Sequence, residues 1–319
     1  MHIRSGVTAG LLFILLLAPI AGTAGEVEKG QFHDRDRDRK VPFTAYWPNL
    51  ESVPTPVVIF SHGLGGTRET ASYFGRALAG AGYVSIHIQH HGSDGDLVSH
   101  VQSRADRRQI LRASLRNFQN FADRLDDIPF VIDELGRRNN VGQWAGRFDL
   151  SRIGMAGHSY GARSTMYAAG EFVGLIGGSA REPRIKAAVV LSPNLPKRDI
   201  EPDRHYGGIR IPLFHVTGTL DDDPAMGPGS ASRRTLPFKL IPHSPQYLLV
   251  LDGADHATFS GTRLGTDTEK PGDKAHTTTV SRAAVAFFDA HLRGLSSKEN
   301  WIESKFSHSL ASGDHFEFK

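Results

Sequence analysis

Residues 157–161 read Gly-His-Ser-Tyr-Gly, and they directly follow a short apolar run, Ile153–Ala156. The run predicts a strand and the small residues after the motif predict a helix, so the motif occupies a sharp turn between the two. In such a turn the middle residue adopts a strained backbone conformation, and flanking glycines remove the Cβ atoms that would clash. The pattern therefore predicts that Ser159 is an exposed nucleophile. An ordinary Gly/Ser turn is the alternative in a chain with 34 glycines.

An aspartate that could orient a histidine base follows a later predicted strand, Pro212–Val216. The turn after this strand contains Asp221, Asp222 and Asp223 in succession. A serine nucleophile of this kind needs a carboxylate that fixes the tautomer of its base. Asp221 is the first choice, and Asp222 and Asp223 remain open as alternatives.

A candidate base follows the strand predicted at Gln246–Leu251. The chain has 16 histidines, and His256 alone lies in a loop after this strand, the final one predicted, and before a predicted C-terminal helix. The order serine, aspartate, histidine is the order in which a nucleophile elbow receives its partners. We therefore expect His256 to be the base.

Amide donors for a developing oxyanion are expected from two places. One is the amide of Tyr160, directly after the nucleophile. The other is Leu64, in the turn Ser-His-Gly-Leu-Gly-Gly at residues 61–66, which follows the strand predicted at Pro56–Phe60. A phosphate cradle is the alternative for this turn, but the lysine of a P-loop is missing.

With these motifs the chain resembles the α/β-hydrolase superfamily. Within it, the chain is similar to secreted or lipoprotein-like esterases grouped with platelet-activating-factor acetylhydrolases, predicted dienelactone hydrolases, chlorophyllases and bacterial polyester hydrolases. The resemblance spans most of the mature chain and rests on residues 39–48 (RKVPFTAYWP), 60–63 (FSHG), 82–86 (GYVSI), 90–94 (HHGSD), 157–161, 218–221 (GTLD) and 253–256 (GADH).

The resemblance implies an α/β-hydrolase fold, in which a mostly parallel, doubly wound sheet is flanked by helices. It also implies the same roles for matching residues: Ser159 as nucleophile, His256 as base, Asp221 as acid, and Leu64 with Tyr160 as oxyanion amides. True dienelactone hydrolases use a cysteine nucleophile, and the chain has no cysteine. That specific activity is therefore not expected.

Length and composition fit one large α/β domain over residues 25–319, because 319 residues with 39% hydrophobic content can bury a sizeable core. Helices are expected at about Glu69–Ala81, Phe118–Arg138, Tyr160–Ala169 and Thr277–Arg293. In the second of these, the residues expected to face the core are Leu125, Ile128, Ile132 and Leu135. Pro129 is expected to kink this helix or to mark its true start.

The N-terminal residues 1–24 are typical of a signal peptide. Arg4 precedes an apolar stretch, Val7–Ile20, and a small-residue region that ends at Ala24. The stretch is short for a membrane span, and a retained anchor is the alternative. We therefore expect a secreted or periplasmic enzyme with no stable span after cleavage. A monomer is the simpler expectation.

Charge and histidine content predict neither a nucleic-acid partner nor a metal. The net charge is +3, and the densest charged run, residues 34–40, alternates in sign. The loop predicted at 89–117 is rich in arginine and serine, and it forms a polar lid in the favoured interpretation. His87, His90, His91 and His100 lie in or beside it, but their spacing matches no metal motif. Two further loops, 193–208 and 222–244, are expected to shape the substrate site.

The sequence therefore predicts a secreted serine hydrolase of carboxylic esters that needs no cofactor and acts on a small-molecule, lipid or polymer ester. Amide hydrolysis, thioester hydrolysis or acyl transfer by the same residues is the first alternative. A catalytically silent binding protein of the same fold is the second.

Overall fold

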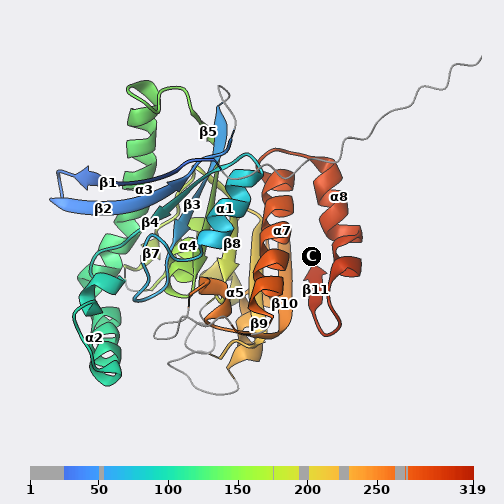
Figure 1. The fold of residues 1–319 in the computed structure, drawn as a ribbon. Helices are drawn as coiled ribbons and strands as arrows, with labels where there is room; N and C mark the ends of the chain where they lie inside the picture. The colour runs from blue at the N-terminus through green and yellow to red at the C-terminus, as the bar shows by residue number, and fades with distance from the viewer. Residues whose placement is uncertain are drawn as a thin grey trace, which may run out of the picture.

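The computed structural model describes residues 25–49, 54–174, 176–193, 201–222, 230–262, 270 and 272–319, so the expected signal peptide lies outside the described residues. Within this range a nine-stranded sheet forms the centre of the molecule, in the order β1-β2-β4-β3-β5-β8-β9-β10-β11 (Figure 1). Its strands are β1 (Val27–Asp34), β2 (Arg39–Tyr46), β3 (Thr55–Ser61), β4 (Val84–Ile88), β5 (Phe148–His158), β8 (Ile185–Leu191), β9 (Leu213–Leu220), β10 (Gln246–Asp255) and β11 (His315–Phe318). A separate pair is formed by β6 (Phe172–Val173) and β7 (Gly178–Ser179).

The strands from β4 to β10 in this order run parallel, whereas β1, β2 and β11 are antiparallel to their neighbours at the two edges. Parallel neighbours need crossover connections, and helices provide them here. The helices are α1 (Ser72–Gly80), α2 (Arg104–Arg116), α3 (Phe118–Asn140), α4 (Tyr160–Ala169), α5 (Pro202–Tyr206), α6 (Leu236–Leu240), α7 (Asp273–His291) and α8 (Ser296–Ser304). Short 3₁₀ turns are η1 (Gly95–Val98), η2 (Ala231–Thr235), η3 (Thr258–Ser260) and η4 (Phe306–Ser309). This is the α/β-hydrolase fold that the motifs predict.

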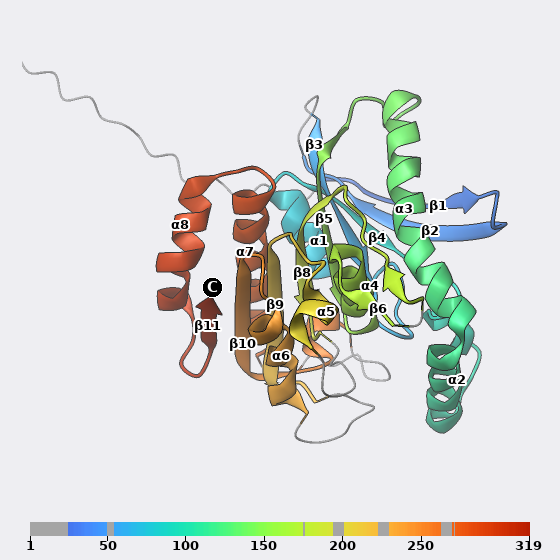
Figure 2. The same cartoon turned by 180° about the vertical axis from the view of Figure 1, so that it is seen from behind.

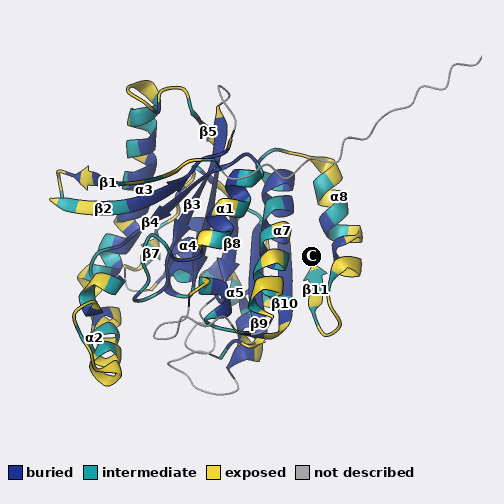
Figure 3. Ribbon diagram, viewed as in Figure 1, coloured by how far each residue is buried: buried dark blue, intermediate teal, exposed yellow. Residues whose placement is uncertain are grey.

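The core lies on both faces of the sheet, because successive strand residues point to opposite sides. In β3, Val58 and Phe60 pack with residues of α1 and α7, whereas Val57 and Ile59 pack with residues of α3. Figure 2 shows the second face, with α3 and α4 in front of the strands. The central strands are almost wholly buried (Figure 3), so their carboxyl ends are fixed rigidly.

Two edge strands were not predicted. The first five residues of β1 alternate between exposed and half-buried, so this strand has no clear pattern of buried apolar residues. β11 follows α8 and pairs with β10, so β10 is not the final strand. The prediction that His256 follows the last strand is wrong in this respect, although His256 does directly follow β10.

Helix α3 begins at Phe118 and continues through Pro129 to Asn140, so a start at Pro129 is wrong. Asn117 caps it, since the Asn117 side chain accepts hydrogen bonds from two amides of the first turn. The four apolar residues expected on its inner face, Leu125, Ile128, Ile132 and Leu135, are buried. This confirms the predicted face of the helix.

The stretch predicted as a polar lid contains helix α2, which projects from the body of the molecule in Figures 1 and 3. Ser103 caps the helix by accepting from the amide of Asp106. Ser114 is its buried residue, and its five arginines lie at positions 104, 107, 108, 112 and 116. Among the helices of the described residues, none combines the length and apolar character that crossing a bilayer requires.

Candidate active site

Ser159 lies at the sharp turn between β5 and α4, with φ 55° and ψ −114°. Few non-glycine residues adopt positive φ, and this strain turns the side chain away from both elements. The flanking glycines leave no room for any other residue. A Cβ atom on Gly157 would lie 2.3 Å from the carbonyl oxygen of Gly161, and one on Gly161 would lie 1.9 Å from that of Ser61. The local sequence therefore forces the elbow that the motif predicts.

The structure brings Ser159, His256 and Asp221 together in a row. Ser159 Oγ lies 2.9 Å from His256 Nε2, and His256 Nδ1 lies 2.8 Å from Asp221 Oδ1. His256 directly follows β10 and Asp221 directly follows β9, so neighbouring parallel strands deliver both side chains to the same edge of the sheet. The hydrogen bonds fit a base that takes a proton from the serine while the acid fixes its tautomer.

Of the three consecutive aspartates, Asp221 is the one that contacts His256. Its carboxylate is fully buried, and its second oxygen accepts a hydrogen bond of 2.8 Å from Thr217 Oγ1. Asp222 instead accepts from the amide of Ala231 at 3.0 Å. Asp223 lies outside the described residues. The geometry favours the register of the turn in which Asp221 is the acid.

Arg234, which the sequence analysis did not single out, is fully buried beside Asp221 and His256. Its Nε lies 2.7 Å from the carbonyl oxygen of Asp221 and 3.1 Å from Oδ1 of the same residue. Its Nη1 donates to the carbonyl oxygens of Ser192 and Pro193, at 3.1 and 3.0 Å. Arg234 therefore ties the chain after β8 to the chain after β9.

Nη2 of Arg234 also lies 3.2 Å from His256 Nδ1. In the tautomer that leaves Nε2 free to accept the serine proton, Nδ1 carries hydrogen and donates to Asp221. It has no lone pair left for a second donor, so the contact between Arg234 and the imidazole is electrostatic. The guanidinium instead forms an ion pair with the carboxylate of Asp221.

His158, the second residue of the motif, holds the base from behind. Its Nε2 donates to the carbonyl oxygen of His256 at 3.0 Å, and the two rings lie 4.8 Å apart. Burial, with a further contribution from the charge of His256, keeps the pKa of His158 well below its usual value. The ring is therefore neutral near neutral pH and acts as a fixed donor.

The glycine-rich turn after β3 lies against the elbow. A Cβ atom on Gly63 would lie 3.3 Å from Ser159 Cβ. The amide of Gly66 donates within the turn to the carbonyl oxygen of Gly63, and the amide of Gly65 donates to that of Ser93. In the part of the chain that the structure describes, the amides of Leu64 and Tyr160 donate to no group. The two amides chosen from the sequence as oxyanion donors are thus available beside the serine.

An apolar cluster adjoins this turn. Leu64 packs against a group that consists of Phe121, Leu125, Tyr160, Tyr167 and Val173. Tyr167 also accepts a hydrogen bond of 2.7 Å from Arg163 Nε, which holds its ring in place. The cluster provides an apolar wall next to the candidate oxyanion amides.

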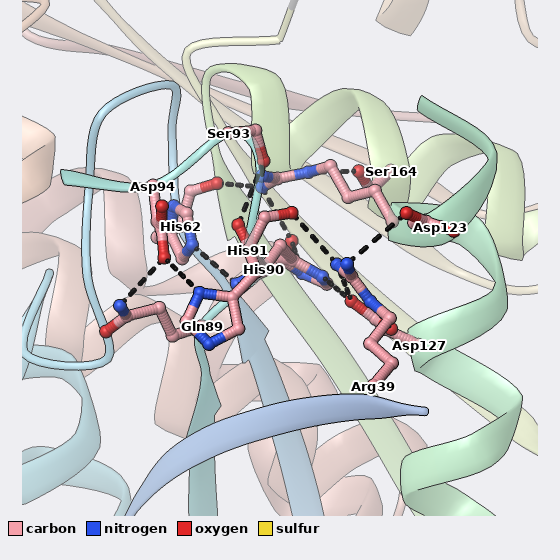
Figure 4. A network of polar contacts seen from close by, with 12 residues as sticks. Arg39, His62, Gln89, His90, His91, Ser93, Asp94, Asp123, Asp127 and Ser164 are labelled. Atoms are coloured by element: carbon pink, nitrogen blue, oxygen red, sulfur yellow. Dashed lines mark hydrogen bonds and ion pairs between the residues drawn. The ribbon is translucent and has the colours of Figure 1, made fainter. Parts of the chain in front are cut away.

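A second row of serine, histidine and aspartate lies beneath the same turn, and Figure 4 labels its histidine and aspartate. Ser61 Oγ is 3.0 Å from His90 Nε2, and His90 Nδ1 is 2.9 Å from Asp127 Oδ2. All three residues are fully buried. Arg124 also donates to Ser61 Oγ, at 3.1 Å. This row is sealed from substrate and belongs to the support of the site.

The histidines set aside as metal ligands do not form one centre among the described residues. His91 alone of the four joins a possible ligand group, with Asp94 and Asp96, whose atoms lie within 4.8 Å of one another. Gln89 Nε2 donates to both carboxylates at 2.9 Å, and His91 Nδ1 lies 3.1 Å from Asp94. These contacts link the three side chains to one another and to Gln89.

One known family model matches part of the chain. Residues 49–123 match the family model described as platelet-activating factor acetylhydrolase, isoform II. The chain is similar to this family of α/β-hydrolases. The matched segment contains β3, the turn with Leu64, β4 and α2, but not Ser159, Asp221 or His256. Among curated proteins, no sequence matches the chain. The family match confirms the resemblance inferred from the motifs and supports a hydrolase that acts on esters.

Proposed function

We propose that this protein is a serine hydrolase of carboxylic esters that works through an acyl-enzyme intermediate. One observation carries the proposal: the hydrogen-bonded row Ser159–His256–Asp221 ends beside two amides that donate to nothing else in the described chain. A row alone would activate a hydroxyl. Together with free amides, it provides what acyl transfer from an ester requires.

In the proposed reaction, Ser159 Oγ attacks the ester carbonyl while His256 Nε2 takes the hydroxyl proton. The amides of Leu64 and Tyr160 bind the oxygen on which negative charge develops, and Asp221 stabilises the imidazolium. His256 then gives its proton to the leaving alcohol. Water, deprotonated in turn by His256, releases the acid and restores the serine.

The proposed substrate class is a small-molecule, lipid or polymer ester with an apolar part next to the carbonyl. The apolar cluster that packs against Leu64 supports this choice. Short-chain esters are the first substrates to test. The mechanism that we propose uses no cofactor.

Labelling of the intact protein with a fluorophosphonate probe tests the proposal, because the probe modifies an activated serine. We expect one label per chain, on the peptide that contains Ser159, and turnover of p-nitrophenyl esters. A folded protein that takes up no label would contradict the proposal and would support a silent binding protein instead.

Rates for p-nitrophenyl esters of increasing acyl length, a polyester film and a phospholipid would then define the substrate. Matched thioester and anilide substrates, and an added acceptor alcohol, separate ester hydrolysis from thioester hydrolysis, amide hydrolysis and acyl transfer. If kcat/KM is higher for the anilide or the thioester than for the ester, the proposed activity becomes amide or thioester hydrolysis.

We further propose that the enzyme is exported, loses residues 1–24, and acts as one monomeric domain over residues 25–319. The composition of the N-terminal segment supports the export. N-terminal sequencing of protein from the periplasm or medium tests the cleavage site, and light scattering tests the oligomeric state. A retained N-terminus in a membrane fraction would favour an anchored enzyme.

A further inference from the structure

We infer that Arg124, on α3, is a positioning residue that holds both oxyanion amides in place at once. The inference rests on the proposed function, because it concerns the two amides that the proposed mechanism uses. Arg124 itself is fully buried and lies behind the backbone. Figure 4 shows the surrounding network, in which side chains from β2, α3, α4 and the segment after β4 converge.

One arm of the guanidinium holds the turn that carries Leu64. Nη2 donates to the carbonyl oxygen of His62 and, at 3.1 Å, to Ser61 Oγ. The His62 carbonyl belongs to the peptide next to the one whose amide is Leu64 N. Because each peptide unit is planar, this bond fixes the unit formed by the His62 carbonyl and the Gly63 amide, which directly precedes the unit that carries the Leu64 amide.

The turn is also fixed from its other side by the ring of His62. His62 Nε2 accepts from the amide of His90 at 3.0 Å, so Nδ1 carries the hydrogen and donates to the carbonyl oxygen of Gly63 at 2.6 Å. Burial and the charge of Arg124 hold the pKa of His62 well below its usual value, which keeps this tautomer neutral. Two successive carbonyls of the turn are thus engaged, and the Leu64 amide is left for a ligand.

A second arm of Arg124 holds the helix that carries the other amide. Nε donates to Ser164 Oγ at 3.0 Å, and Ser164 Oγ donates to the carbonyl oxygen of Tyr160 at 3.2 Å. The guanidinium carbon also lies 4.5 Å from the centre of the Tyr160 ring. The first turn of α4, with the Tyr160 amide, is therefore attached to the same group as the Leu64 turn.

The remaining nitrogen closes the arrangement. Nη1 donates to Ser93 Oγ at 2.7 Å, and the carbonyl oxygen of Ser93 accepts from the amide of Gly65 at 2.9 Å. The segment after β4 is thereby bound both to Arg124 and to the turn. One planar group with donors in three directions joins all three segments, and a lysine ammonium could not reproduce this geometry.

The charge of Arg124 has no carboxylate in contact within the described residues. Three hydroxyls, one carbonyl and one aromatic ring surround it, and the closest link to an acid runs through Ser61 and His90 to Asp127. Burial lowers the pKa of Arg124 to about 10, so the group remains charged at neutral pH. Burying an unpaired charge is costly. An apolar residue would serve packing alone at lower cost, which favours a role in the site.

The test compares Arg124→Lys with Arg293→Lys. Arg293 is a matched control, because its side chain also donates to backbone carbonyls, those of Ala81 and Gly82, but at the end of α7. For each variant we would measure kcat and KM for a p-nitrophenyl ester per labelled serine, and the inhibition constant of an alkyl boronic acid, whose tetrahedral adduct occupies the oxyanion site.

For Arg124→Lys we expect kcat to fall about 10²-fold, the cost of a misplacement of about 1 Å, with KM changed less than about threefold. Boronate affinity should fall by the same factor as kcat/KM. A role in stability alone would lower the melting temperature and the labelled fraction, but not the values per labelled serine. Arg293→Lys should show that pattern.

Wild-type values per labelled serine in Arg124→Lys would overturn the inference while leaving the proposed function intact. Failure of the wild-type protein to label or turn over esters would instead reject the proposed function. If Arg124→Lys does not fold, Ser164→Ala removes only the link to Tyr160. We then expect a loss of about 10-fold in kcat and boronate affinity together, and an unchanged boronate affinity would overturn the inference.

Discussion

The protein has two places where serine, histidine and aspartate are hydrogen-bonded in a row, and their geometry is nearly the same. In the row at the elbow the two distances are 2.9 and 2.8 Å, and in the row beneath the glycine-rich turn they are 3.0 and 2.9 Å. We call these the elbow row (Ser159, His256, Asp221) and the buried row (Ser61, His90, Asp127). Their surroundings distinguish them.

In the elbow row the serine has φ 55° and the histidine side chain is 21% exposed. In the buried row Ser61 belongs to a regular strand, its hydroxyl already accepts from Arg124, and His90 is inaccessible. Burial, with the charge of Arg124, lowers the pKa of His90 to about 4. Under the proposed function, hydrogen bonds alone therefore do not make a nucleophile. The serine must also be accessible to substrate, lie in a strained turn, and have backbone amides nearby that donate to no other group.

The largest difference between the rows is expected when the serines are replaced. Ser159→Ala should lower ester turnover by about 10⁴ to 10⁶ with the fold unchanged, because the nucleophile is lost. Ser61→Ala removes one acceptor of Arg124, so a loss of about 10-fold or less is expected. Turnover and circular dichroism of both variants check this. Retained activity in Ser159→Ala, or a fluorophosphonate label on Ser61, would break the comparison.

The aspartates should separate into one that affects rate and one that affects stability. Asp221→Asn should lose about 10⁴ in kcat, because the histidine tautomer is no longer held, whereas Asp222→Asn should lose much less. Asp127 accepts from His90 and from two arginines, Arg37 and Arg39. Asp127→Asn should therefore reduce the free energy of unfolding by about 3–5 kcal/mol.

Urea unfolding of Asp127→Asn measures the change in unfolding free energy, and steady-state kinetics of Asp221→Asn measure the change in kcat. Greater sensitivity of the rate to Asp222 than to Asp221 would shift the register of the turn and leave the serine mechanism in place.

Acid should destabilise the protein through its buried histidines. Burial lowers the pKa of His87, His90, His215 and His291 to about 4. In an unfolded chain these rings titrate near about 6.5, so the unfolded state binds more protons between about pH 4 and 6.5. Their contribution to stability is thus complete above about pH 6.5 and declines as the pH falls through this window. Unfolding free energies from urea titrations at several pH values check the slope.

For the elbow row, acid should reduce kcat/KM, since a protonated base cannot accept the serine proton. One ionisation should describe the acidic limb of the profile of kcat/KM against pH.

For stability, an unfolding free energy that stays constant from about pH 6.5 to 4.5 would contradict the assignment of the buried histidines as neutral.

The smallest effect is expected from metal removal. Neither row contains a metal ligand in the proposed mechanism, and in the group of His91, Asp94 and Asp96 both carboxylates accept from Gln89. EDTA should leave kcat/KM and its pH profile unchanged. An EDTA-sensitive rate that zinc or calcium restores would make this group part of the site.

The elbow row could be predicted from sequence, because each member lies in the turn after a predicted strand and parallel strands end at one edge of the sheet. The burial of Arg234 beside the elbow row could not be predicted in this way. Its neighbour Arg233 has the same chemistry but is exposed, so the sequence does not distinguish the two. The buried row was missed because its members come from β3, the end of β4 and α3, with no local pattern. A weak indication exists: Arg124 and Asp127 each precede a core residue of α3 by one position, which places these charges near the buried face.

The fit of Gly161 against the carbonyl of Ser61 also limits how such a chain can diverge. A methyl group at this position would lie well within the van der Waals contact distance of a backbone atom in β3, and no rotamer relieves a clash at Cβ. Drift at position 161 therefore requires a simultaneous shift of the main chain of a central strand. In a library randomised over the elbow, surviving clones should keep glycine here even when selected only for folding, so the motif would persist in descendants that have lost their chemistry.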